Sequence, residues 1–357
     1  MRIVPAMPSP APNAPAADAT QRWLDPAFFD FWATRLNPLW TWNRPRARLL
    51  ERRIEAAGAV TLVLQANRHW RGIGPGQHVE LGVEIEGRWL RRHYSPTATG
   101  PGRVEITLRP QPQGRVSPYL AQTAPIGSVF ELGQGFGDFA WPAGTGPVLL
   151  LAAGSGITPM RALLRAQAER GFDRDVTLLY WVRQREDACF AAELRALADA
   201  HPRLDLRLLV TGEGAPRVDA LPESQWPALA AAEVLACGPG GFVQAARQRL
   251  QDHVGSFQAE AFSAPVFDAG DAGEVEVVLA RSGRTLRLPR ARSLLEGLEA
   301  HGLKPRHGCR MGICNTCVCQ RQSGATRHLH SGQQHDEPAS PVRLCVQAPS
   351  TNLILEL

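Results

Sequence analysis

The residues of this chain best suited to chemistry are four cysteines near its end. Cys309, Cys314 and Cys317 follow a C-x4-C-x2-C pattern, and Cys345 lies further along the chain. This is one of the spacings with which proteins hold a 2Fe–2S cluster. Glycines beside the first cysteine and between the first two permit the tight turn that brings three thiolates together. The sequence therefore predicts a 2Fe–2S centre with these four ligands.

The same cysteines have other conceivable uses. A structural zinc site usually has two C-x2-C hooks, and only one is present here. A disulfide framework is disfavoured because seven cysteines are few for 357 residues. We interpret Cys189 and Cys319 as buried, inert thiols. The sequence leaves open that Cys319 replaces Cys317 as a ligand.

Composition limits the class of protein. A chain of 357 residues with 44% hydrophobic and 20% charged residues is sufficient for two or three globular domains. The net charge of +5 comes from dispersed arginines, which argues against nucleic-acid binding and permits an acidic partner or a membrane surface. No apolar run approaches the roughly 18–20 residues of a membrane span, and the start of the chain does not resemble a signal peptide. A cytoplasmic location is expected, and the oligomeric state stays open.

Residues 1–45 precede the first expected domain. They begin with a Pro/Ala-rich stretch that we predict to be a disordered tail, followed by an aromatic-rich extension from Trp23 to Trp42. Pro26 is suited to the first turn of a short helix over Ala27–Leu36. We expect the aromatic side chains to clamp the extension onto its own domain. The alternative is a docking surface for a partner or for a bilayer interface.

Residues 46–142 contain short alternating runs separated by Gly and Pro, which is typical of a small antiparallel β-barrel. Two motifs within them are suited to binding a phosphorylated aromatic ligand. In one, Arg92 offers a bidentate phosphate contact and Tyr94 a flat aromatic face. In the other, Gly114-Arg115-Val116-Ser117 opens a short helical run whose backbone N–H groups could hold an anion.

Residues 143–262 change to continuous apolar runs alternating with helices, the pattern of a doubly wound parallel sheet. The first predicted strand, residues 147–153, leads into Gly154-Ser155-Gly156-Ile157-Thr158-Pro159. We expect Thr158 to cap a helix that begins at Pro159. A later strand, residues 233–236, ends at Cys237-Gly238-Pro239. Both turns lie at the carboxyl ends of strands, where such sheets bind ligands. There is no G-x-x-x-x-G-K-[ST] motif, which argues against nucleotide hydrolysis.

The last part of the chain is expected to be a separate small domain. Residues 263–273 are rich in Ala, Pro, Asp and Gly and are predicted to be a linker. Residues 274–357 combine alternating strands, a helix over Ser293–His301, the cysteine loop and further strands at Val342–Val346 and Asn352–Leu357. This length suffices for a β-grasp domain.

Four motifs and the cysteine pattern occur in a characteristic order: R-x-Y-S at Arg92–Ser95, G-x-x-S at Gly114–Ser117, G-S-G-I-T-P at Gly154–Pro159, and C-G-P at Cys237–Pro239. In this order the chain resembles the ferredoxin–NADP reductase superfamily, with a plant-type 2Fe–2S ferredoxin domain fused at its C-terminus. The resemblance covers residues 46–357. It implies an antiparallel β-barrel FAD domain, a doubly wound NAD(P) domain and a β-grasp ferredoxin domain.

The resemblance also implies roles for individual residues, none of which needs to act as a general acid or base. Arg92 would bind the flavin phosphates, Tyr94 would stack on the isoalloxazine, and Ser95 would hydrogen-bond near its reactive edge. The pyrophosphate of FAD would be held by Gly114, Val116 and Ser117. The dinucleotide phosphates would be cradled by Gly154, Gly156, Thr158 and Pro159. The nicotinamide would be bordered by Cys237, Gly238 and Pro239, and Phe262 would lie near the flavin.

The choice of nucleotide depends on the end of the second strand of this sheet. An acidic residue there favours an unphosphorylated ribose, whereas this chain has Arg183 and Arg185, which are suited to a 2′-phosphate. The sequence therefore predicts NADPH.

The predicted cofactors define a direction of electron flow, from NADPH through FAD to the 2Fe–2S cluster. The chain has no recognisable oxygen-activating iron or haem site, so we expect another protein as terminal acceptor. The segment from Phe31 to Pro45 resembles reductases that partner membrane fatty-acyl desaturases, which implies peripheral contact with a membrane-bound enzyme. The alternative acceptor is a ring-hydroxylating or other diiron oxygenase. A hypothesis of another class is an Fe–S redox sensor without turnover.

Overall fold

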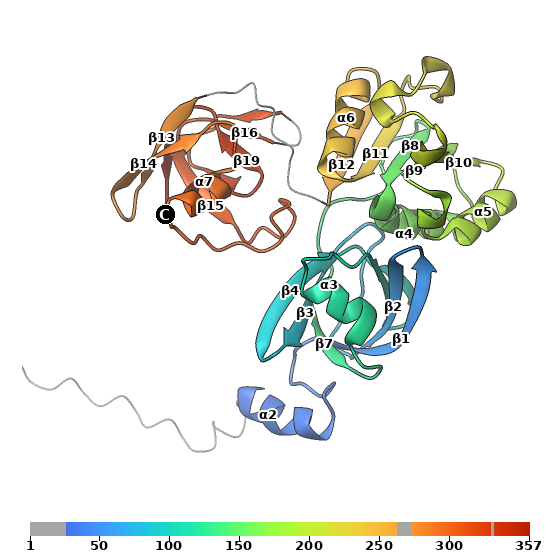
Figure 1. Cartoon of the computed structure of the whole chain (residues 1–357), viewed down its shortest axis with the longest axis horizontal. Helices are drawn as coiled ribbons and strands as arrows, with labels where there is room; N and C mark the ends of the chain where they lie inside the picture. Colours follow the sequence, from blue (N-terminus) through green and yellow to red (C-terminus); the bar gives the residue numbers. More distant parts are fainter. Residues whose placement is uncertain (1–25, 263–272, 330–331) are drawn as a thin grey trace, which may run out of the picture.

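The computed structural model describes residues 26–262, 273–329 and 332–357. The predicted tail, with Trp23, and all but the last residue of the predicted linker lie outside the described residues. Three folded parts follow one another along the chain, and Figure 1 shows the third beside the other two. The expected three-domain architecture is confirmed.

The first domain is a seven-stranded antiparallel sheet with the order β4-β3-β7-β1-β2-β6-β5, curled into a barrel (Figure 1). Its strands are β1 (Arg46–Ala56), β2 (Ala59–Ala66), β3 (Val79–Ile85), β4 (Arg88–Tyr94), β5 (Thr97–Gly100), β6 (Arg103–Leu108) and β7 (Val129–Leu132). Leu49, Leu62 and Ile106 are completely buried inside it, as the period-2 pattern requires. The short helix α3 (Val116–Pro118) continues as a π-helical turn, Tyr119–Thr123.

The second domain is a five-stranded parallel sheet with the order β10-β9-β8-β11-β12. Its strands are β8 (Val148–Ala153), β9 (Val176–Val182), β10 (Leu204–Val210), β11 (Glu233–Gly238) and β12 (Ser256–Ala261). Strand order reverses between β8 and β11, which is where such sheets bind ligands. The sequence analysis did not anticipate β12. This edge strand is only partly buried over most of its length and lacks the apolar run of the other four.

Helices cover both faces of this sheet. Leu150 and Leu178 pack with α4 (Ile157–Ala168) and α5 (Ala191–Ala200), whereas Leu149 and Leu179 belong to a separate core with α6 (Gly240–Leu250). The predicted start of α4 at Pro159 is wrong, because the helix begins at Ile157. Thr158 therefore lies in the first turn and donates its hydroxyl to the Ser155 carbonyl at 3.0 Å instead of capping the helix.

The third domain has a five-stranded sheet with the order β14-β13-β20-β15-β18 and a small sheet with the order β17-β16-β19. Its elements are β13 (Glu274–Leu279), β14 (Arg284–Pro289), α7 (Leu294–Ala300), β15 (Val318–Ser323), β16 (Thr326–His328), β17 (Gln334–His335), β18 (Ser340–Arg343), β19 (Gln347–Pro349) and β20 (Leu353–Leu355). Ser293 caps α7 by accepting the Glu296 N–H at 3.2 Å. The predicted strand over Val342–Val346 is wrong beyond Arg343, because Cys345 lies in the turn between β18 and β19.

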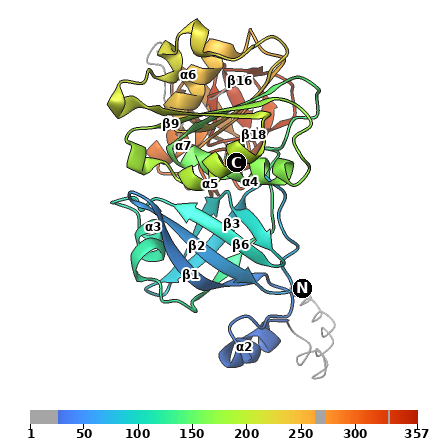
Figure 2. The ribbon, with the colours of Figure 1, turned by 90° about the vertical axis from the view of Figure 1, so that its right-hand side faces the viewer.

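Helix α2 (Pro26–Leu36) projects from the end of the barrel that faces away from the second domain, as Figures 1 and 2 both show. Its predicted bounds are correct to within one residue. The expectation that its aromatic residues clamp the extension is wrong, because Phe31, Trp32, Trp40 and Trp42 are all exposed. No helix of the described residues combines the length and the apolar character needed to cross a membrane.

Candidate cofactor sites

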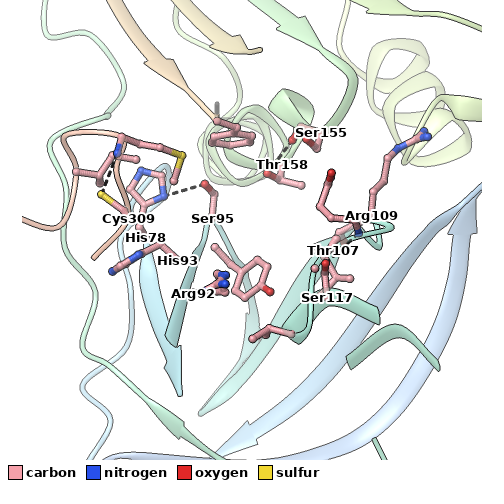
Figure 3. Close-up of a pocket in the computed structure, with 18 of the residues that line it drawn as sticks. His78, Arg92, His93, Ser95, Thr107, Arg109, Ser117, Ser155, Thr158 and Cys309 are labelled. Carbon is pink, nitrogen blue, oxygen red and sulfur yellow. Dashed lines mark hydrogen bonds between the residues drawn. The ribbon is translucent and has the colours of Figure 1, made fainter. Parts of the chain in front are cut away.

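A cavity of about 430 Å³ lies where the three domains meet. Side chains of the barrel, of the α4 turn and of the cysteine loop all line it. Eight of the residues singled out from the sequence do so together with Cys309: Arg92, Tyr94, Ser95, Gly114, Val116, Ser117, Thr158 and Phe262. Figure 3 shows Cys309 and Ser95 on one side of this cavity and Arg109 and Ser117 on the other.

The end of β4 forms one wall. Tyr94 is the last residue of this strand, and burial raises the pKa of its phenol, so the ring stays neutral. Arg92 lies two positions earlier and therefore leaves the same face of the strand. A flat aromatic ring and a guanidinium on one face are suited to a ligand with both an aromatic and a phosphate group.

The turn before α3 forms the opposite wall. Ser117 accepts the Gln111 N–H through its hydroxyl at 3.0 Å. A Cβ at Gly114 would approach both the Gln111 Cβ and the Ser117 hydroxyl to 3.2 Å, so a larger residue would crowd the turn. Val116 is buried against the barrel core and fixes the start of the helix. The tight turn therefore leaves its backbone N–H groups open to close approach by a phosphate.

The two glycine turns of the parallel sheet touch each other. A Cβ at Gly156 would lie 2.0 Å from the Cys237 carbonyl oxygen, so only glycine allows β8 and β11 to end side by side. Cys237 is fully buried, and burial raises the pKa of its thiol. The Phe262 N–H donates to the Gly238 carbonyl at 2.9 Å, which holds Phe262 at the cavity.

A hydrogen-bonded chain that the sequence analysis missed runs from the cavity into the second domain. The Ser95 hydroxyl lies 2.9 Å from Nδ1 of His78, and Nε2 of His78 lies 2.6 Å from Glu260 Oε1. Figure 3 shows the Ser95–His78 contact beside Cys309. Both ring nitrogens of this buried histidine are thus engaged. Nothing in the local pattern around His78 marks it, because its partners come from distant segments.

Buried charges also join the barrel to the second domain. Arg161 of α4 contacts Glu105 of β6 at 2.8 Å, with both side chains more than 90% buried. Arg53 of β1 contacts the same carboxylate at 2.6 Å. A further link joins Arg109, which lines the cavity, to Asp187 at 3.0 Å. The sequence analysis anticipated none of these residues.

The cysteine loop contributes Cys309, Met311 and Ile313 to the cavity wall. Two residues of the loop depend on close packing. A Cβ at Gly308 would lie 2.9 Å from the Cys314 sulfur, and Gly312 has φ +77° with Val346 only 2.8 Å from where its Cβ would be. The loop therefore turns as tightly as its glycines predict.

The four predicted ligands form two pairs. The Cys309 N–H donates to Cys314 Sγ at 3.3 Å and the Cys314 N–H to Cys309 Sγ at 3.4 Å, whereas Cys317 Sγ lies 3.2 Å from Cys345 Sγ. Hydrogen bonding with the partner thiol lowers the pKa of Cys314 and of Cys317. Within the described residues no three potential metal ligands are gathered at one point, but two sulfur pairs are suited to a centre of two irons that takes two thiolates on each.

The two remaining thiols of the sequence argument are buried elsewhere. Cys319 lies in β15 within the core of the third domain, where burial raises the pKa of its thiol and its sulfur is 3.4 Å from the Gln320 carbonyl oxygen. Cys189 is buried beside Tyr180 in the second domain. Both thiols are buried as expected, and their inertness stays a prediction.

Arg183 and Arg185 do not reach the central cavity. They line a separate hollow of about 530 Å³ at the ends of β9 and β10, together with Arg217. Arg185 is paired there with Glu213 at 2.6 Å. The hollow holds three guanidinium groups, of which the sequence analysis had anticipated two.

Models of known families match all three parts of the chain. The oxidoreductase FAD-binding domain matches residues 54–141, the oxidoreductase NAD-binding domain residues 150–248, and the 2Fe-2S iron-sulfur cluster binding domain residues 277–350. The chain is 34% identical over 333 residues to the NADPH oxidoreductase of Mycobacterium tuberculosis. The alignment covers 90% of this chain and 86% of that protein. The chain belongs to the ferredoxin reductase-type 2Fe–2S flavoproteins. It is an NAD(P)H-dependent oxidoreductase with FAD and a 2Fe–2S cluster as cofactors.

Other relatives of this reductase serve oxygenases. The glycine betaine monooxygenase reductase subunit of Chromohalobacter salexigens is 26% identical over 322 residues, covering 79% of this chain and 86% of the relative. The 3-ketosteroid-9-alpha-monooxygenase ferredoxin reductase component of Mycolicibacterium smegmatis is 32% identical over 271 residues, covering 70% and 76%. The crystal structure of phthalate dioxygenase reductase shares the fold, with a TM-score of 0.56, 23% identity and coverage of 87% and 97%.

Proposed function

We propose that this reductase takes electrons from NADPH and delivers them, through FAD and the 2Fe–2S cluster, to a separate oxygen-activating metalloenzyme. The observation that carries the proposal is the shared cavity wall. Cys309 of the cysteine loop lines the same cavity as Tyr94 and Phe262. A flavin held between these aromatic residues would therefore be next to a cluster ligand, without another protein between them.

Bound FAD supplies the conversion of a two-electron hydride donor into single electrons. The residues of the chain bind and orient it. Arg92 and the Gly114–Ser117 turn are positioned to take its phosphates, and Tyr94 to stack on its ring. The Gly154 turn would take the dinucleotide phosphates, and Cys237 with the two residues after it would border the nicotinamide. No acid or base is required for this transfer.

The hollow at the ends of β9 and β10 supports NADPH as the donor. Arg183 and Arg217 line it without an ion pair within the described residues, whereas Arg185 is engaged by Glu213. Guanidinium groups match the geometry and charge of a 2′-phosphate. The relative from M. tuberculosis is also named for NADPH.

The acceptor is proposed at two levels. At the coarser level it is an oxygen-activating enzyme, because relatives of this reductase are components of monooxygenases. At the finer level we favour a membrane fatty-acyl desaturase, since the segment from Phe31 to Pro45 resembles the reductases of such enzymes and its aromatic residues are exposed. A soluble diiron or ring-hydroxylating oxygenase is the second candidate.

Reconstitution separates these acceptors. The purified reductase is supplied with NADPH and either a desaturase in vesicles or a soluble oxygenase, and product formation is compared with NADPH consumption. We expect coupled turnover with the desaturase. Coupled turnover with the oxygenase alone would replace the finer proposal. A protein that lacks flavin absorbance and does not reduce cytochrome c with NADPH would instead be an Fe–S redox sensor without turnover.

A further inference from the structure

Helix α2 exposes apolar side chains and buries a charged one, which is the reverse of an ordinary surface helix. Phe31, Trp32 and Leu36 are exposed, the last to 81%, whereas Asp30 is 96% buried. Residues three and four apart lie on one helix face, so Trp32 and Leu36 share a face pointing outward and Asp30 and Ala33 share the inner one. A helix normally buries its apolar face, and this one buries its carboxylate.

The buried carboxylate explains how this arrangement is held. Asp30 Oδ1 accepts the Trp42 N–H at 2.5 Å and Oδ2 accepts Arg44 Nε at 2.7 Å. The Asn67 side-chain amide of the barrel donates to the Leu39 carbonyl at 3.0 Å, and His69 Nε2 contacts the Thr41 carbonyl at 2.8 Å. The extension is therefore fastened by polar contacts. Phe31, Trp32 and Trp40 take no part in these polar contacts, and each is more than half exposed.

The exposed apolar residues lie on α2 and on the loop that follows it, at this end of the barrel. We call Phe29, Phe31, Trp32, Leu36, Trp40 and Trp42 the apolar platform; each is more than a third exposed. Phe29 meets Trp42 edge to face at 5.5 Å, which joins the helix to the loop after it. Contiguous apolar surface of this kind usually marks a site of interaction.

The charges around the platform identify its occupant. Between Pro26 and Leu50 the sequence has four arginines and a single acidic residue, Asp30, which is buried and paired with Arg44. Arg35 is exposed beside the platform, with its guanidinium 3.5 Å from the centre of the Phe31 ring. Tryptophan and phenylalanine favour the boundary between headgroups and acyl chains, and arginine favours anionic headgroups.

We propose that the apolar platform is a peripheral membrane anchor that inserts into the headgroup boundary of an anionic bilayer. Helix α2 has 11 residues and is therefore about 16 Å long, too short to cross an apolar core of about 30 Å. It lies on the surface instead. Figures 1 and 2 place α2 at the end of the barrel remote from the second domain, and each platform residue keeps more than a third of its surface exposed among the described residues.

Sedimentation with vesicles tests the anchor without NADPH or an acceptor, so its outcome is independent of the proposed function. The full-length holoprotein is mixed with vesicles of phosphatidylcholine, with or without phosphatidylglycerol. We expect binding to both, and tighter binding with phosphatidylglycerol. Replacing Phe31 and Trp32 together by Ser should weaken partitioning about tenfold or more, because two large apolar side chains leave the boundary. Arg35→Gln should weaken it about fivefold, and only on anionic vesicles.

Ile54→Ser is the matched control, because this side chain is 89% exposed but lies near the other end of β1. Its partitioning should equal that of the unmodified protein, and all variants should keep their flavin absorbance. The proposal is overturned if the protein binds neither kind of vesicle, or if the platform variants bind as tightly as the control. Binding that requires an integral membrane protein in the vesicle would overturn it in favour of a protein partner.

Discussion

Nε2 of His78 lies 2.6 Å from Oε1 of Glu260, and this contact joins the barrel to the last strand of the nucleotide-binding domain. The two residues are 182 positions apart in the chain. The other ring nitrogen of His78 contacts Ser95, which lines the flavin cavity. His78 thus links the contact between the two domains to the wall of the cavity.

Replacing His78 by Phe should destabilise the contact between these domains. The second oxygen of Glu260 already has no hydrogen-bond partner among the described residues, so the substitution leaves a buried carboxylate without support. Leaving a buried acceptor without its hydrogen bond typically costs about 1–3 kcal/mol, and more where the acceptor is charged. We expect a lower free energy of unfolding and faster release of FAD in denaturant titrations. His78→Gln retains a donor and should lose less; an unchanged stability of His78→Phe would refute the linking role.

Features that depend on adjacent residues could be predicted from the sequence, whereas features that depend on contacts between distant segments could not. Arg92, Tyr94 and the Gly114–Ser117 turn were recognisable because each motif is local, and its function follows from adjacent residues. His78 and Arg161 were not, because their significance arises only when distant strands and helices meet. The aromatic extension was misinterpreted for a related reason. Its residue types favour burial, but the buried Asp30 fastens the helix with its aromatic face outward.

The Glu105–Arg161 pair should make the barrel–nucleotide domain interface sensitive to acid. Burial alone would raise the pKa of Glu105, but hydrogen bonds from Arg161 and Arg53 outweigh it and hold the pKa below its ordinary value of 4.5. The folded carboxyl is therefore the stronger acid. Its stabilisation is complete above that ordinary value and is lost as pH falls through the lowered folded value.

Denaturant unfolding followed across this pH range measures the effect. Glu105→Gln should lose stability at neutral pH, by about 3 kcal/mol or more, and should depend less on pH in the acid range. Glu51→Gln serves as control, because Glu51 forms an exposed pair with Arg53 at 3.9 Å and such pairs contribute about 0–1 kcal/mol. Equal acid sensitivity of the Glu105→Gln variant and the unmodified protein would contradict the argument.

Nucleotide preference should depend on the arginines at the ends of β9 and β10. Arg183→Ala and Arg185→Ala should each raise the KM for NADPH about tenfold and change that for NADH little, because only NADPH has a 2′-phosphate to lose a charged contact. Glu213→Gln should lower the KM for NADPH, since it releases Arg185 from its ion pair. Arg195→Ala, on the exposed face of α5, is the control. A preference of the unmodified protein for NADH would refute this assignment.

The cluster ligands can be distinguished from their neighbour by single substitutions. Cys319→Ser should keep the 2Fe–2S cluster, because the Cys319 sulfur faces the Gln320 carbonyl at 3.4 Å and a hydroxyl can donate to the same oxygen. Cys317→Ser should lose it, because Cys317 Sγ forms one of the two sulfur pairs with Cys345. Iron content and the absorbance of the cluster measure both results.

FAD content is the internal control for these two variants. The barrel has its own hydrophobic core, distinct from the core of the cluster domain, so both variants should bind FAD at the level of the unmodified protein. Loss of iron together with FAD would indicate general misfolding and would call for the same measurement on Cys345→Ser. Retention of the cluster by Cys317→Ser and its loss in Cys319→Ser would mean that β15 presents the other thiol to the iron. In that case the sulfur pair of Cys317 and Cys345 could not be the ligand pair of the second iron.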